Sequence, residues 1–260
     1  MKFGCCTSAD NYDLLVENGY DRIILSGVEL SAMGEQDFKR LRSTLENGAV
    51  ECRALNSFCS PELVLCGNGY SYKTVEAYTK ALAGRAAELG VRYIGVGSPN
   101  SRSIPTGYPH DAAVSQFELS IAGMCRICEE YDIDVLVEPV CTLECNFINT
   151  TDEAVALVKG LALGNLNIVF DTFHAFMMGE DDMPLRRAME YVKLVHVAQH
   201  IDGRRHYLRS EGVDEYRAYL QTLAECGYDG EVSVEAFVGE PEAELAGSLS
   251  IMTSLCSHAG

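Results

Sequence analysis

The segments DVLVE (134–138), NIVFD (167–171), KLVHVA (193–198) and EVSVE (231–235) decide the fold. Each is a short apolar run that carries one ionisable side chain at or near its end: Glu138, Asp171, His196 and Glu235 in turn. Continuous apolar runs of this length are typical of strands buried on both faces of a parallel sheet. The four polar residues are 33, 25 and 39 residues apart, about one βα unit each.

Similar runs recur along the whole chain and predict eight strands. These are Lys2–Cys6, Arg22–Leu25, Glu51–Leu55, Tyr93–Gly97, Asp134–Glu138, Asn167–Asp171, Lys193–Ala198 and Glu231–Ala236. Segments with helical spacing of apolar residues lie between them, at Ser71–Leu89, Asp111–Tyr131 and Asp214–Cys226, and Thr150-x-x-Glu153 is a capping box before another helix. We therefore predict an α/β protein with a (β/α)8 TIM barrel, a single domain over residues 1–260. The alternative is a doubly wound open sheet, but no glycine-rich phosphate fingerprint follows the first strand.

Composition narrows the class of partner. The chain has 260 residues, with 38 acidic and 20 basic side chains and a net charge of −18. A surface with this much negative charge repels phosphate backbones and anionic membranes. We therefore expect neither a nucleic acid nor a membrane as a partner. The start of the chain lacks a signal-peptide pattern, and no apolar run approaches the ~18 residues of a membrane span. We expect a cytoplasmic protein whose eleven cysteines are reduced thiols.

The four polar strand ends predict a metal site. Parallel strands of a barrel present their carboxyl ends at one rim, where barrel enzymes carry their active sites. Three carboxylates converging there repel one another unless a cation neutralises them. Three oxygen ligands and one imidazole favour Mn²⁺, Mg²⁺ or Co²⁺, with Zn²⁺ as an alternative. We expect one divalent metal ion, with Mn²⁺ first.

The chain also resembles a known group of proteins. The segments GSPNSRSIPTG (97–107), EPVCTLECNFINT (138–150), FDTFH (170–174), LVHVAQ (194–199) and GYDGEVSVEAF (227–237) are similar to the xylose isomerase-like barrel superfamily, within it the sugar phosphate isomerase/epimerase and D-tagatose 3-epimerase group. The resemblance implies metal ligands at Glu138, Asp171, His196 and Glu235, with Glu138 and Glu235 as the acid/base pair. It further implies that Glu144 and His174 bind substrate.

The match to this group has two departures. Members usually carry an acidic residue three positions after the ligand histidine, where this chain has Gln199. An arginine normally follows, at a position occupied here by Asp202. We take Arg204 as the substrate-binding arginine, with Arg205 as the alternative. These departures bear on the substrate more than on the metal.

The expected reaction is epimerisation of a ketose at C3 through a metal-stabilised cis-enediolate. One glutamate removes the proton next to the carbonyl and the other returns it on the opposite face. Aldose–ketose isomerisation and dehydration of a keto-polyol such as an inosose are the alternatives on the same metal site. The substrate is a small sugar, and the group implies a homodimer or homotetramer. A three-zinc DNA-repair endonuclease is disfavoured, because no histidine precedes His110 and the net charge is −18. A sugar-binding protein on a decayed barrel is disfavoured because all four ligands are present.

Other polar residues have plainer interpretations. Cys125-x-x-Cys128 lies on a predicted helix face without a second pair, so we expect core packing and no zinc knuckle. Arg102 is expected in an ordinary βα loop, with an anion contact as the alternative. We expect His110 and His258 at the surface and His200 in a loop.

Overall fold

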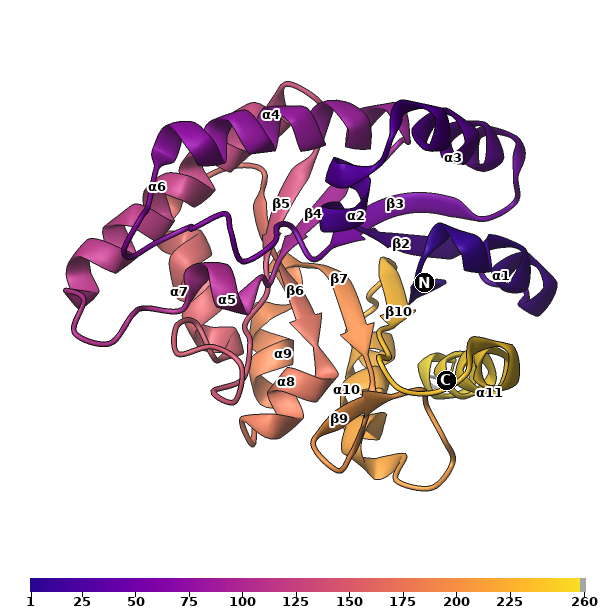
Figure 1. Cartoon of the computed structure of the whole chain (residues 1–260). Helices are drawn as coiled ribbons and strands as arrows, with labels where there is room; N and C mark the ends of the chain where they lie inside the picture. Colours follow the sequence, from indigo (N-terminus) through magenta and orange to yellow (C-terminus); the bar gives the residue numbers. More distant parts are fainter. Residues whose placement is uncertain (258–260) are drawn as a thin grey trace.

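The computed structural model describes residues 1–257, so His258 lies outside the described residues. Eight parallel strands close into a barrel in the order β1-β10-β7-β6-β5-β4-β3-β2 (Figure 1). Their bounds are β1 (Lys2–Cys6), β2 (Arg22–Ser26), β3 (Glu51–Asn56), β4 (Tyr93–Val96), β5 (Asp134–Val137), β6 (Leu166–Asp171), β7 (Val192–Val197) and β10 (Glu231–Val234). The predicted (β/α)8 barrel is confirmed, and each predicted strand agrees with an observed one to within a few residues.

Helices surround the ring of strands on the outside (Figure 1). They are α1 (Tyr12–Asn18), α2 (Gly27–Ala32), α3 (Glu35–Asn47), α4 (Tyr72–Glu88), α5 (Pro99–Arg102), α6 (His110–Glu129), α7 (Thr151–Leu161), α8 (Thr172–Met177), α9 (Met183–Ala188), α10 (Asp214–Glu225) and α11 (Pro241–Cys256), with short 3₁₀ turns at Ala9–Asn11 and Met189–Tyr191. The predicted capping box is present at the start of α7, where Thr150 and Glu153 each accept the other's backbone N–H. This exchange satisfies two donors that a helix start leaves free.

The two larger of three apolar clusters hold the barrel together, and the third consists of Cys141, Phe173 and Ala198. One fills the space between strands and helices, and Cys125 and Cys128 of α6 are buried in it, as expected. The other fills the barrel interior with Cys6, Ile24, Ala54, Leu136, Val169 and Leu194. Packed side chains of this kind close a TIM barrel internally, so the mouth above them is a pocket and no channel runs through.

The amino-terminal end of the barrel holds a buried carboxylate of its own. Glu231, the first residue of β10, accepts a hydrogen bond from Ser233 Oγ at 2.9 Å and lies 3.8 Å from Arg22 Nε. Burial raises the pKa of Glu231 to about 7, because the loss of hydration of the charged form outweighs the stabilisation that Ser233 and Arg22 give it. Glu231 and Glu235 thus lie at opposite ends of one strand.

The polar loop expected after β7 is instead a β-hairpin. β8 (Gln199–Ile201) pairs antiparallel with β9 (Arg204–His206), with Ile201 opposite Arg204. Asp202 and Gly203 form the turn with positive φ values of 50° and 74°. An Asp-Gly turn of this type matches the twist of the two strands it joins. The hairpin projects from the carboxyl end of β7 toward the barrel mouth.

All eleven cysteines are free thiols, and Cys226 alone among them is exposed.

Within residues 1–257, no helix combines the length and apolar character needed to cross a membrane.

Candidate metal centre

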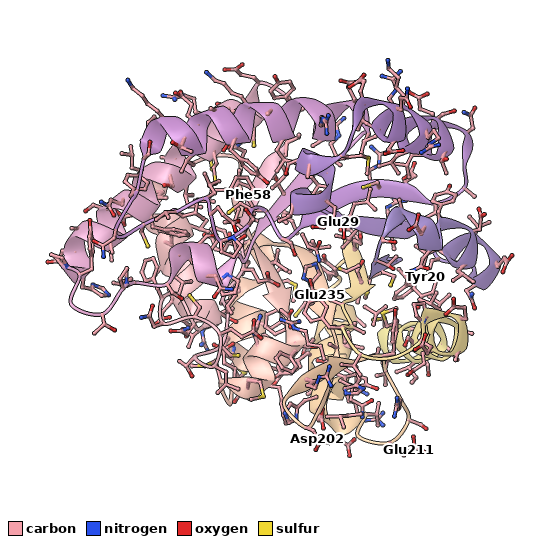
Figure 2. All side chains as sticks on the ribbon, viewed as in Figure 1. Tyr20, Glu29, Phe58, Asp202, Glu211 and Glu235 are labelled. Carbon is pink, nitrogen blue, oxygen red and sulfur yellow. The ribbon has the colours of Figure 1, made fainter. Side chains whose placement is uncertain are left out.

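Four neighbouring strands carry the predicted ligands to one place. Asp171 ends β6, His196 lies in β7, and Glu138 and Glu235 directly follow β5 and β10. These strands are consecutive in the barrel, so their carboxyl ends form one side of its mouth. One ligand atom from each of the four residues lies within 4.8 Å of the others. In Figure 2, Glu235 lies within the ring of strands, whereas Asp202 and Glu211 lie at the outer edge of the molecule.

All four side chains are buried, and His196 is the centre of their contacts. His196 Nδ1 lies 3.1 Å from Glu138 Oε1 and 3.7 Å from Glu235 Oε2. Burial lowers the pKa of His196, but Cys6 and Glu235 outweigh it and leave that pKa well above its ordinary value. Burial raises the pKa of Glu138. The contacts with the two glutamates therefore favour the charged form of the imidazole.

Asp171 is fixed by its position at a helix start. It is the N-cap of α8, and its Oδ1 accepts backbone N–H groups from Phe173 at 2.7 Å and His174 at 3.2 Å. Burial raises the pKa of Asp171, yet the Arg205 guanidinium holds it well below its usual value. Asp171 is therefore a carboxylate, with Oδ1 turned to the helix and Oδ2 to the site.

Arg205, not Arg204, enters the cluster. Arg205 Nη1 lies 2.6 Å from Asp171 Oδ2 and 2.9 Å from Glu235 Oε2, and its guanidinium stacks 4.6 Å from the Phe173 ring centre. Arg204 is exposed. Adjacent residues of a strand point to opposite faces, so the β9 register directs only one of the two arginines inward. The structure therefore places Arg205 at the cluster and Arg204, our predicted substrate-binding arginine, on the exposed face; which of the two binds substrate stays a prediction.

Glu144 and His174 lie together beside the cluster. A carboxylate oxygen of Glu144, a ring nitrogen of His174 and Cys141 Sγ lie within 4.8 Å of one another. His174 Nδ1 faces the Cys141 N–H at 3.2 Å, and its Nε2 lies 2.5 Å from Arg205 Nη2. Burial lowers the pKa of His174 to about 3, so the ring is neutral. A neutral imidazole has one lone pair and accepts one of these donors at a time.

A second layer of contacts, absent from our sequence prediction, orients the glutamates. Asn56 Nδ2, at the end of β3, donates to Glu235 Oε1 at 2.7 Å. Arg102, which we expected in a loop, is the fully buried last residue of α5, and its Nη2 donates to the Glu138 backbone carbonyl at 2.6 Å. Gly97 leaves room for Glu138, since a Cβ at that position would overlap the carboxylate. Spacing alone carries no signal for these three residues.

Gln199 and His200 serve the hairpin. Gln199 Oε1 accepts the Arg209 N–H at 2.8 Å, and its amide nitrogen donates to the Glu211 carbonyl. The His200 N–H donates to Glu215 Oε2, and His200 Nε2 accepts the Gly203 N–H. The departure at Gln199 is therefore used to brace the segment that carries Arg205.

The donor set fits a divalent cation. Three buried carboxylates face one guanidinium and one imidazole, so the cluster requires positive charge. Oxygen and imidazole ligands suit Mn²⁺, Mg²⁺ and Co²⁺, and zinc also accepts histidine with carboxylates. His196 Nδ1, the ring nitrogen that faces Glu138 and Glu235, would be the nitrogen ligand of such a cation. The residues present thus match a metal site in both charge and ligand type.

A pocket of about 360 Å³ lies next to the cluster. Its wall includes Cys6, Asn56, Tyr207 and Phe237, with Glu29 at the rim. Phe237 is 70% exposed and its ring lies 5.5 Å from the Arg205 guanidinium. A small ligand beside the four polar residues would therefore meet hydroxyl, amide and aromatic groups.

A closed parallel barrel with buried carboxylates and a histidine at its carboxyl-end mouth has its polar cluster where TIM-barrel enzymes carry their active sites. The family model described as xylose isomerase-like TIM barrel matches residues 12–255, and the chain belongs to this family.

Relatives and solved structures agree with that assignment. The chain is 31% identical over 135 residues to a ketose 3-epimerase of Arthrobacter globiformis, covering 50% of this chain and 45% of the relative. It is 30% identical over 135 residues to an inosose isomerase of Bacillus licheniformis, covering 49% and 48%. These alignments span about half the length of the curated relatives. Among structures, D-psicose 3-epimerase of Clostridium cellulolyticum H10 superposes with a TM-score of 0.82 at 18% identity, covering 98% of this chain and 99% of that one. The IOLI protein with a bound zinc atom gives a TM-score of 0.72 at 18% identity, covering 99% and 98%.

Proposed function

We propose that the protein is a sugar isomerase of the epimerase type that uses one divalent metal ion and inverts a ketose at C3. The observation that carries the proposal is the convergence of Glu138, Asp171, His196 and Glu235 within 4.8 Å at the barrel mouth. The names of the relatives, ketose 3-epimerase and inosose isomerase, support an isomerase acting on a polyhydroxy ketone.

The two glutamates suit a proton transfer that inverts a carbon. They follow β5 and β10, which are separated in the barrel by β6 and β7, so they approach a bound sugar from different sides. Burial raises the pKa of Glu138, which brings a carboxyl group closer to the neutral range where a catalytic acid works best. Asn56 fixes Oε1 of Glu235 and leaves Oε2 facing His196 and Arg205. In this scheme one glutamate takes the C3 proton and the other returns it.

A divalent cation bound by the four residues supplies Lewis-acid stabilisation of the negative charge that develops on the substrate oxygens. Mn²⁺ is our first choice, because the ligands are three oxygens and one nitrogen without a thiolate. Arg205, Glu144 and His174 surround the cluster and would hold the sugar hydroxyls. Together these side chains orient the substrate and exclude water from its reacting carbon.

Two alternatives use the same residues. If a glutamate instead removed a C1 proton of the ketose and returned it to C2, the product would be an aldose. If the proton transfer expelled a hydroxyl group, the protein would be a dehydratase of the inosose type. Cytoplasmic location and a homodimer or homotetramer stay predictions.

The experiment is an isotope test on the Mn²⁺-loaded protein. Each member of a panel of ketoses, aldoses and inososes is incubated in deuterium oxide and followed by NMR. We expect deuterium at C3 of a ketose together with its C3 epimer. An aldose product would show that the reaction is an isomerisation and not an epimerisation. Loss of water from the substrate would show that it is a dehydration.

Three variants test the assignment of roles. Glu138→Gln and Glu235→Gln are each expected to lower kcat by roughly 10²–10⁴, the usual worth of a general acid or base. Glu231→Gln is the matched control, since it also removes a buried carboxylate from β10 but at the far end of the barrel. Full activity in either site variant would contradict the proposal.

A further inference from the structure

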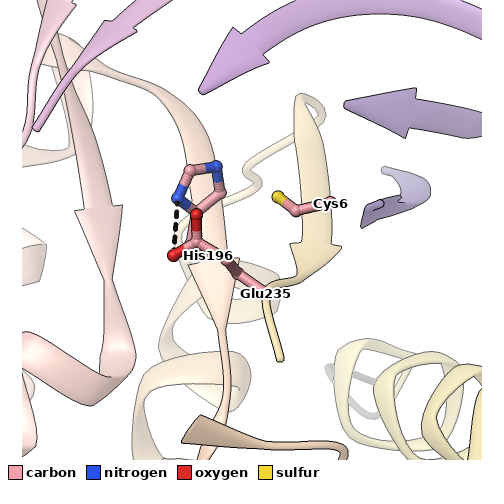
Figure 3. Close-up of side chains that lie close together, drawn as sticks. All are labelled: Cys6, His196 and Glu235. Atoms are coloured by element: carbon pink, nitrogen blue, oxygen red, sulfur yellow. Dashed lines mark ion pairs between the residues drawn. The ribbon is translucent and has the colours of Figure 1, made fainter. Parts of the chain in front are cut away.

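Cys6 lies against the metal cluster but takes no part in the proposed reaction. It is the last residue of β1, which pairs with β10 in the closed barrel. Its Sγ, a ring nitrogen of His196 and a carboxylate oxygen of Glu235 lie within 4.8 Å of one another, and all three residues are buried. Figure 3 shows the Cys6 sulfur pointing toward the His196 ring from the side opposite the Glu235 contact.

The two ring nitrogens of His196 have different surroundings. Nδ1 faces Glu138 at 3.1 Å and Glu235 at 3.7 Å. Nε2 is buried, has no oxygen or nitrogen partner, and lies on the Cys6 side of the ring in Figure 3, where the thiol interacts with the ring. A thiol is only a weak hydrogen-bonding group, so a buried ring nitrogen that faces Cys6 alone points to a ligand at that position.

We propose that Cys6 Sγ, His196 Nε2 and Glu235 form a second metal position, selective for a thiophilic divalent cation of the zinc class. Thiolate, imidazole and carboxylate are the three ligand types that zinc takes in proteins, and three protein ligands leave a fourth position for water. Soft thiolate ligands favour zinc over Mn²⁺ and Mg²⁺. The thiol loses its proton to solvent on binding, as every cysteine ligand does.

The two metal positions compete for His196. A neutral imidazole has one N–H and one lone pair. A cation at Nε2 places the N–H at Nδ1, where it donates to Glu138, and so removes the nitrogen that the four-residue cluster uses. This step rests on the proposed function, since it assumes that the cluster binds a catalytic cation through Nδ1. Zinc at Cys6 therefore acts as an inhibitor of the Mn²⁺ form.

Co²⁺ absorption tests the site directly, because a thiolate ligand to Co²⁺ gives an intense near-ultraviolet charge-transfer band. We expect the band in the wild-type protein, its loss in Cys6→Ser and Cys6→Ala, and its retention in Cys226→Ser, which removes the exposed thiol. Glu138→Gln disrupts the four-residue cluster and should keep the band. A wild-type protein without the band, or one whose band survives both Cys6 variants, would overturn the proposal.

Competition is measured separately by titrating Zn²⁺ into the Mn²⁺-loaded protein and following free Mn²⁺ by electron paramagnetic resonance. Cys6→Ser should raise the Zn²⁺ concentration that releases half of the Mn²⁺ by at least about tenfold, since losing even an outer-layer partner costs roughly 10–100-fold in metal affinity. An unchanged midpoint would overturn the competition. A protein that shows the cobalt band but binds no Mn²⁺ would refute the proposed function and leave the Cys6 site standing.

Discussion

Asn56 and Glu235 are joined across the barrel mouth: Asn56 Nδ2 donates to Glu235 Oε1 at 2.7 Å, although β3 and β10 are not neighbours in the ring. The contact reserves one carboxylate oxygen and leaves the other facing His196 and Arg205. The orientation of a proposed acid/base group therefore depends on an uncharged side chain from a distant strand.

Asn56→Ala should lower both Mn²⁺ affinity and kcat/KM by roughly 10–100-fold, the usual cost of removing a partner that orients a metal ligand. Metal titration and steady-state kinetics measure the two effects. Asn167→Ala is the control, because it removes a buried amide at the amino-terminal end of the barrel, where Asn167 contacts Asp134. If Asn56→Ala and Asn167→Ala lost Mn²⁺ affinity and kcat/KM equally, Asn56 would act only through the stability of the folded protein.

Gly97→Ala should displace Glu138 without unfolding the barrel. The added Cβ overlaps the Glu138 carboxylate, which is the movable end of a side chain, so the glutamate shifts while the backbone stays. We expect loss of Mn²⁺ binding at nearly unchanged apo-protein stability, measured by metal titration and thermal unfolding. Gly160→Ala in α7 meets no atom within 4 Å and should stabilise the protein by about 0.5–1 kcal/mol. Normal metal affinity in Gly97→Ala would contradict our placement of Glu138.

Arg205→Met separates metal binding from substrate binding. Removing the guanidinium 2.6 Å from Asp171 leaves the carboxylates without their cation, so the metal-free protein should lose stability and Mn²⁺ should bind more tightly. The kcat/KM should nevertheless fall roughly 10²-fold, as for loss of one charge-stabilising donor. Arg204→Met, on the outer face of the same strand, should change neither quantity. Weaker Mn²⁺ binding in Arg205→Met would refute this division of roles.

The raised pKa of Glu231 implies that the free energy of unfolding depends on pH. Its folded-state pKa of about 7 lies above the ordinary value of 4.5, so folding favours the protonated carboxyl. The resulting stabilisation is complete below pH 4.5 and is lost as pH rises through 7, by about 3 kcal/mol in all. Glu231→Gln should therefore be more stable than the wild type at pH 8 and similar at pH 5.

Urea unfolding at pH 5 and pH 8 measures this difference. Asp182→Asn is the control with the opposite sign: hydrogen bonds from Arg186 and Thr222 lower the pKa of Asp182, so its contribution is lost only as pH falls below the ordinary value of 3.8. Its effect on stability should be the same at both pH values. If the free energy of unfolding of Glu231→Gln changed with pH in the same way as that of the wild type, Glu231 would be excluded as the source of the pH dependence.

The barrel was predictable from sequence because its strands are continuous apolar runs at regular intervals. The same regularity predicted that Glu138, Asp171, His196 and Glu235 would meet, since a polar residue at or near the end of each run lies at the carboxyl end of its strand and so at the same rim. That reasoning needs no side-chain geometry, only the direction of parallel strands.

The second layer was not predictable by the same route. Asn56 and Gly97 act through contacts between strands that are remote in sequence, and no local pattern marks them. The β8–β9 hairpin was predictable and was missed: Asp202-Gly203 is a strong turn signal between short strand-forming segments. Placing the turn there fixes the register and would have selected Arg205 over Arg204.

β1 pairs with β10, so the first strand of the barrel gains one of its two neighbours only when the last strand has been made. During synthesis, β1 leaves the ribosome long before its final neighbour, and its open edge must be kept from pairing elsewhere. Cys6 and Glu235 face each other across this seam, so the thiol position is the last part of the mouth to be assembled. A chain in which β10 has not yet paired with β7 and β1 would hold Asp171, His196 and Glu138 in place but lack Glu235, the fourth ligand.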